Sequence, residues 1–172
     1  YHNFVYTYIS LFSIVNPIGM SAVFLTMTKQ FSFIERKKIS KNIVIYGSTL
    51  LITVFYLGSY ILRFFGISLA ALQIAGGLII FSSSWGMLHS EEKENSDDQM
   101  DLKTVEDISF FPLTMPLTTG AGAIATTIAL SANINATEHN YIFLDYIAAT
   151  IGIICVLFTT YFCYVFSDRI LG

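Results

Sequence analysis

Long apolar stretches, separated by shorter polar ones, dominate the sequence. Five of them reach the length of a membrane-spanning helix, about 20 predominantly apolar residues. They cover Phe4–Met27, Asn42–Leu62, Ser68–Leu88, Ile108–Leu130 and Tyr141–Val165. They are apolar on all sides, unlike the strands of a membrane barrel, which alternate over about ten residues. The pattern predicts an all-α fold, a polytopic membrane helical bundle, because helices satisfy their own backbone in lipid.

The composition excludes a soluble globular domain. Only 12% of the 172 residues are charged and 54% are hydrophobic, whereas soluble domains carry about 25% charged residues. The charges are also segregated. Five of the nine bases lie in residues 29–41, and eight of the twelve acids lie in residues 91–107.

The distribution of Lys and Arg predicts the topology. The connections at 28–41 and 89–107 and the tail after the fifth span hold eight bases, and Arg63 alone lies on the other side. The eight-base side should be cytoplasmic. We therefore expect a multi-pass protein of the cell (inner) membrane with its N-terminus outside. Residues 90–107, which are polar and acidic, are then a cytoplasmic linker between two halves.

Two of the five spans contain all the prolines of the chain. Pro17 lies in the first span, and Pro112 and Pro116 lie in the fourth. A proline inside a helix removes one hydrogen bond and clashes with the preceding turn, so both spans should be discontinuous, near Pro17 and Pro116. One such proline is more simply a kink. Two interrupted segments, each the first of its half, favour an inverted-repeat transporter with a site near the bilayer midplane.

The candidate substrate-binding residues are those around the two predicted interruptions. A broken helix offers free N–H groups to a carboxylate and free carbonyls to an ammonium group or a cation. No Lys, Arg, Glu or His lies well inside a span, so a zwitterionic or neutral solute is favoured. Coupling to a cation and the absence of coupling both stay open. The predicted site comprises Asn16, Pro17, Gly19, Thr114, Pro116, Thr118, Thr119, Gly120 and Gly122.

Other polar residues favour simpler interpretations. His2, His89 and His139 lie in separate connections and share no ligand spacing, so no metal site and no cofactor are predicted. Gln73 and Thr126 are neutral hydrogen-bonding groups within spans, and Gln73 is more simply an interhelical contact. The small residues of the third span favour close helix packing. The lipid bilayer is an expected partner, nucleic acid is not, and a homo-oligomer is left open.

At these residues the chain resembles the MarC family of integral membrane proteins, also described as small neutral amino acid transporters. The resemblance rests on the segments 11–19 (LFSIVNPIG), 65–68 (FGIS) with 74–79 (IAGGLI), and 111–116 (FPLTMP) through 120–124 (GAGAI). Family members usually read Gly-Pro-Gly in the last segment, and Ala121 replaces that proline here.

The resemblance implies six spans in two inverted three-helix halves, with discontinuous helices 1 and 4. Residues 1–89 would form the first repeat and 108–172 a second, incomplete one, so we expect a sixth helix to be missing from the chain. The implied function is secondary transport of small neutral amino acids by alternating access; the alternative is a non-transporting scaffold or regulatory protein. We expect no enzyme. Redox relatives in the wider superfamily use cysteines on helices 1 and 4, and this chain has none there.

Overall fold

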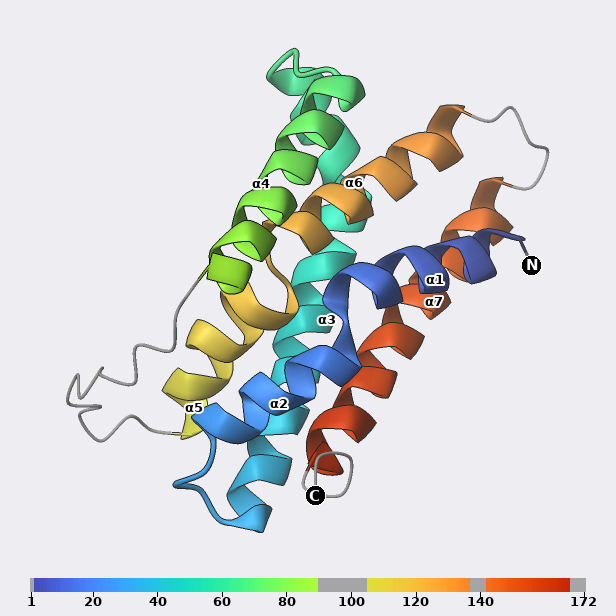
Figure 1. Ribbon diagram of the computed structural model, residues 1–172. Coiled ribbons are helices and arrows are strands. Elements are labelled where there is room, and N and C mark those ends of the chain that lie inside the picture. The colour runs from blue at the N-terminus through green and yellow to red at the C-terminus, as the bar shows by residue number, and fades with distance from the viewer. Residues whose placement is uncertain (1, 90–104, 137–141, 168–172) are drawn as a thin grey trace.

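The computed structural model describes residues 2–89, 105–136 and 142–167, and this part of the chain contains helices and no strand (Figure 1). Seven elements are α-helical and η1 is a π-helix, whose hydrogen bonds join residues five apart. In chain order they are α1 (His2–Val15), α2 (Pro17–Met27), α3 (Phe33–Phe64), α4 (Leu69–His89), α5 (Val105–Ile108), η1 (Ser109–Thr118), α6 (Ala121–Ala136) and α7 (Ile142–Val165).

Three helical stretches of the described residues are long and apolar enough to cross a membrane. They are His2–Met27, which combines α1 and α2, then α3 and α7. The predicted third span corresponds to α4, and the fifth corresponds to α7, although Tyr141 lies outside the described residues. Most of the linker predicted at 90–107 also lies outside them, and its last three residues belong to α5. An all-helical fold with membrane-spanning helices is confirmed.

The prediction was wrong about the connection between the first two spans. Residues 28–41 were expected to lie between helices, but α3 already begins at Phe33. Its start is fixed by a capping box, in which the Ser32 side chain accepts from the Glu35 N–H and Glu35 accepts from the Ser32 N–H at 2.8 Å. This pairing satisfies two donors that the first turn of a helix leaves free. Ile39 and Ser40 are fully buried, so the added turns belong to the core.

Two interrupted helical pairs pack around two long helices. α1 and α2 contact α7, whereas η1 and α6 contact α3, and α3 packs against α7. The interrupted pairs also meet each other, α1 against α6 and α2 against η1, and α4 packs on α6. Figure 1 shows α1 and η1 running towards the middle of the molecule, and α2 and α6 running away from it. Both interruptions therefore lie in the central part of the bundle.

The buried apolar side chains form two clusters, one on each side of the interruptions. The larger joins α1, α6 and the middle of α3 and α7; the smaller joins α2, η1, the first turns of α3 and the end of α7. The larger consists of Leu11, Val15, Leu51, Phe55, Ala123, Leu130, Ile134, Ala149, Ile153, Val156 and Leu157. The smaller consists of Phe24, Ile39, Ile43, Leu113 and Tyr164.

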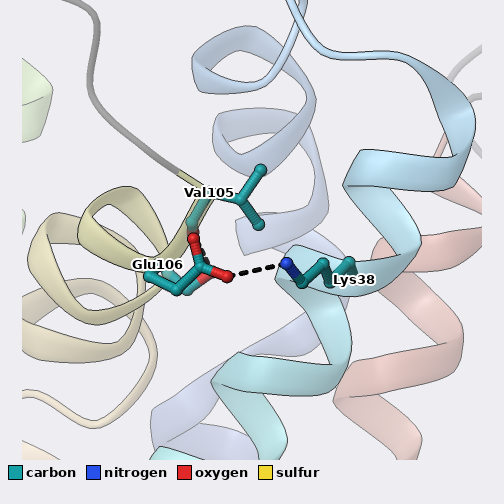
Figure 2. Close-up of polar contacts among 4 residues, drawn as sticks. Lys38, Val105 and Glu106 are labelled. Carbon is teal, nitrogen blue, oxygen red and sulfur yellow. Dashed lines mark hydrogen bonds and ion pairs between the residues drawn. The ribbon is translucent and has the colours of Figure 1, made fainter.

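An ion pair ties the basic start of α3 to the short helix that precedes η1. The Nζ atom of Lys38 lies 2.7 Å from Oε1 of Glu106 (Figure 2). Both side chains are more than half exposed, and such surface pairs contribute little to stability. The pair places the basic segment and α5 at the same end of the bundle, where Figure 1 also shows the end of α7. Arg63, in the last turn of α3, lies at the far end.

Candidate functional site

The first interruption is a one-residue break at Asn16. This residue has φ 43° and ψ 61°, the left-handed conformation, and it is the N-cap of α2 with Pro17 as the first helical residue. Its Oδ1 accepts a hydrogen bond from the Gly19 N–H at 3.2 Å. A Cβ at Gly19 would lie 2.5 Å from Asn16 Nδ2, so the cap needs glycine there. The break predicted near Pro17 is confirmed.

The fourth predicted span is also interrupted, but the break lies a few residues beyond Pro116, where it was expected. The chain stays helical through Pro112 and Pro116, and the break comes at Thr119 and Gly120. In an α-helix the proline ring clashes with the carbonyl four residues back. The wider π winding changes that geometry, because each amide faces the carbonyl five residues back, as the Thr119 N–H does at 2.8 Å from Thr114 O.

The three threonines of the predicted site bond within the π-helix and its final turn. Thr114, Thr118 and Thr119 are buried, and each hydroxyl donates to a carbonyl five residues back. Because a hydroxyl has one proton, Thr118 Oγ1 must accept from the hydroxyl of Tyr164, which lies 2.9 Å away. These groups hold η1 together in this structure, and their oxygens can still accept.

The remaining predicted residues differ in accessibility. Asn16 and Gly19 are exposed, Pro17 and Gly122 are buried, and Gly120 is half-buried. The Ile124 N–H donates to Gly120 O at 3.1 Å, so the N–H groups of residues 121–123 precede the first hydrogen bond of α6. One residue of the predicted substrate site, Gly122, lines a polar cavity.

This cavity, which we call the polar cavity, lies between α1, α4 and α6 and has a volume of about 280 Å³. It is half open. Among the described residues, its lining carries five neutral hydrogen-bonding side chains and no charged one. The lining residues are Tyr6, Ser10, Gln73, Gly76, Gly77, Gly122, Ala125, Thr126, Ala129, Leu130 and Asn133. Ligand pockets usually range from about 300 to 1,000 Å³, so the polar cavity suits a small solute.

Two hydroxyls of the polar cavity are not used within their own helices, whereas neighbouring ones are. Ser13, on the same helix as Ser10, donates to Ile9 O at 2.9 Å, and Thr127 donates to Ala123 O at 2.7 Å. Within the described part of the chain, Ser10 and Thr126 make no such bond, so both hydroxyls remain able to bond a solute.

Two glycines shape the wall that α4 contributes. A Cβ at Gly76 would lie 2.7 Å from the Cβ of Ala125, so this glycine allows α4 to approach α6 closely. A Cβ at Gly77 would meet nothing within 4 Å. The expected close packing of the third span therefore holds at Gly76, while Gly77 leaves the cavity open beside Gln73.

The sequence prediction missed Tyr6, Ser10 and Asn133 as cavity residues. Each is a single polar residue in an apolar helix, without a motif of its own. Ser10 lies six residues before the first break and Thr126 six residues after Gly120. At about 1.5 Å per residue both lie roughly 9 Å from the interruptions. This equal spacing on two opposed helices could have indicated that Ser10 and Thr126 lie close together.

Comparison with known proteins places this architecture in context. The model of the MarC family of integral membrane proteins matches residues 1–171. The chain is 34% identical over 167 residues to the UPF0056 membrane protein YvbG of Bacillus subtilis, covering 95% of this chain and 76% of that protein. It is 35% identical over 130 residues to UPF0056 membrane protein MJ0972 of Methanocaldococcus jannaschii. That match covers 74% of this chain and 57% of the relative.

A third relative is the UPF0056 membrane protein YhcE of Escherichia coli, 30% identical over 151 residues, which cover 86% of this chain and 69% of that protein. No solved structure matches the chain.

Proposed function

The chain belongs to the MarC family of integral membrane proteins, and from this premise we propose that it is a secondary transporter of small neutral amino acids or similar zwitterionic solutes, working by alternating access. One observation carries the proposal. A cavity with neutral hydrogen-bonding walls lies within a membrane bundle, between the two helices that are interrupted. Such a cavity matches a solute that is strongly polar and has no net charge.

The arrangement of the interrupted pairs supports alternating access. α1 followed by α2, then α3 and α4, would be one three-helix repeat. η1 followed by α6, then α7, would be the corresponding part of an inverted second repeat. The two interrupted pairs run in opposite directions where they meet (Figure 1). Inverted repeats of this kind rock about a site at their interface.

The solute would bind between α1 and α6. Its carboxylate would be near Gly122, where the N-terminal end of α6 provides N–H groups and a favourable dipole. Its ammonium group would donate to the oxygens of Ser10 and Thr126, and the amide of Gln73 would bond either group. Asn16, Pro17, Gly19, Gly120 and the threonines of η1 would shape the adjoining interruptions, with the η1 hydroxyl oxygens acting as acceptors when the helix moves.

The topology that we propose follows the positive-inside rule. The end of the bundle that contains the Lys38–Glu106 pair would face the cytoplasm, with the linker at 90–107 beside it, and the N-terminus would lie outside. The polar cavity lies before the first interruption on α1 and after the second on α6, at the end of the bundle where α1 begins, and it would then open towards the exterior. Its half-open shape corresponds to an outward-facing state.

Uptake of radiolabelled glycine and alanine into proteoliposomes tests the proposal. Ser10→Ala and Thr126→Val should each lower uptake by about tenfold, the effect of losing one hydrogen bond to a charged group. Ser13→Ala and Thr127→Val are matched controls, because their hydroxyls are used within their own helices. Uptake that equals that of empty liposomes, with no amino acid raising the melting temperature, would reject transport and favour the scaffold alternative.

A further inference from the structure

A second cavity lies on the other side of the interruptions, between α3 and η1, and its character is the opposite of the first. We call it the apolar cavity. It has a volume of about 340 Å³ and is open on one side. The residues that line it are Tyr46, Thr49, Leu50, Thr53, Val54, Phe110, Thr114 and Met115.

The walls of the apolar cavity are mostly hydrocarbon, and two of the four hydroxyls that line it are already used. Thr49 donates its hydroxyl to Ile45 O at 2.8 Å and Thr114 donates to Ser109 O, so neither proton is available to an occupant. Tyr46 and Phe110 meet edge to face, with their ring centroids 5.8 Å apart, and join the two walls. A polar solute would recover only part of its hydration here, from the hydroxyls of Tyr46 and Thr53, whereas a hydrocarbon chain would gain contact.

The depth of the apolar cavity matches one leaflet of a bilayer. The basic segment of α3 ends at Lys41, and the lining begins at Tyr46 and ends at Val54. At about 1.5 Å per residue, these positions lie roughly 8 and 20 Å beyond Lys41. The hydrocarbon of one leaflet is about half of 30 Å thick. Lipid acyl chains therefore lie at this level of the helix.

The charges at the end of the apolar cavity nearest the start of α3 favour a lipid with an anionic head group. The first turns of α3 carry four cations, and the Lys38–Glu106 pair lies where α3 meets the helix leading into η1 (Figure 2). Lys38, which is more than half exposed, lies three turns before Thr49 on the side of α3 that lines the cavity, whereas Lys37 and Lys41 lie on other sides of the helix. Basic residues at a membrane surface attract anionic head groups. We propose that the apolar cavity holds an acyl chain of an anionic phospholipid, whose phosphate contacts the basic end of α3.

Native mass spectrometry of the purified full chain, titrated with phosphatidylglycerol or phosphatidylcholine, tests the proposal. Phosphatidylglycerol should be retained at least several-fold better. Thr53→Phe places a ring in the cavity and should weaken its binding by about tenfold, the effect of displacing about two methylene groups. Lys38→Gln should reduce the preference for phosphatidylglycerol. Ile151→Phe, an exposed position on α7, is the matched control and should change neither result.

Three outcomes would overturn the proposal: equal retention of the two lipids, equal binding by Thr53→Phe and Ile151→Phe, or a lipid-free dimer that Thr53→Phe dissociates. The last result would assign the apolar cavity to a second copy of the chain. Melting temperatures of the variants without added lipid separate a binding defect from a folding defect. Thr53 is exposed, so its replacement should leave that temperature unchanged.

Discussion

The hydroxyl of Tyr164 donates to Oγ1 of Thr118 across 2.9 Å, and this bond connects the end of α7 to the last residue of the π-helix. Both side chains are buried, and the ring of Tyr164 stacks on Phe24 of α2 with centroids 4.6 Å apart. One residue of α7 thus contacts the elements that flank both interruptions.

Replacing Tyr164 with Phe should destabilise the protein modestly. The ring contact with Phe24 remains, but the hydrogen bond to Thr118 is lost, at a cost of about 1 kcal/mol. The melting temperature in detergent should fall by about 2–4 °C. Tyr161→Phe, one turn earlier on α7, is the control. Equal melting temperatures for the two variants would show that the Thr118 bond does not stabilise the fold.

Substitutions at Asn16 should follow an order set by its backbone. Asn16→Asp keeps an oxygen for the Gly19 N–H and should be mild. Asn16→Gly loses the cap but tolerates the left-handed conformation. Asn16→Ala loses the cap and also strains the backbone, a combined cost on the order of 2 kcal/mol. Thermal unfolding measures the series. If the Ala and Gly variants were equally stable, the left-handed conformation at residue 16 would be refuted.

Gly76 and Gly77 should respond differently to alanine. Gly76→Ala pushes α4 away from Ala125 and should cost about 1–3 kcal/mol, partly offset by the better helix propensity of alanine. Gly77→Ala meets no neighbour and should be neutral or slightly stabilising. The melting temperatures of the two variants make the comparison. Ala125→Gly should restore the stability of Gly76→Ala; if it fails to do so, the close approach of α4 to α6 is not the cause.

Loss of the Ser32 cap should weaken the start of α3. Ser32→Ala removes the acceptor for the Glu35 N–H and should cost about 1 kcal/mol, whereas Ser32→Asp retains an acceptor. Hydrogen exchange of residues 33–38 should rise in the alanine variant and stay near the original rate in the aspartate variant. Unchanged exchange in Ser32→Ala would mean that packing of Ile39 alone fixes the helix start.

Local signals predicted the first interruption correctly, and hydrogen bonds that the sequence analysis did not foresee shifted the second. Asn16 before Pro17 is an N-cap followed by a proline at the first helical position, and both preferences act within one turn. Pro116 lacks half of this signal, because Met115 before it is not an N-cap residue. There the hydroxyls of Thr118 and Thr119 bond carbonyls five residues back, and the helix widens instead of ending.

The polar cavity was only partly predictable. Gly122 was found because it lies near a predicted break, and Gln73 and Thr126 were recognised as polar groups in apolar spans. Ser10 and Thr126 are far apart in the sequence, and only the packing of α1 on α6 brings them to one cavity. The missed start of α3 has a simpler cause, because Ser32 and Glu35 form a recognisable capping box.

The π winding of η1 also determines how this segment tolerates changes in length. Ten residues that close their hydrogen bonds over five positions contain more residues per turn than an α-helix would. Deletion of one residue, such as Met115, would let a turn revert to α winding while the chain beyond Gly120 keeps its orientation. In the regular α-helix of α7, the same deletion would rotate every later side chain by about 100°. Deletion of one residue should therefore be tolerated in η1 and be disruptive in α7.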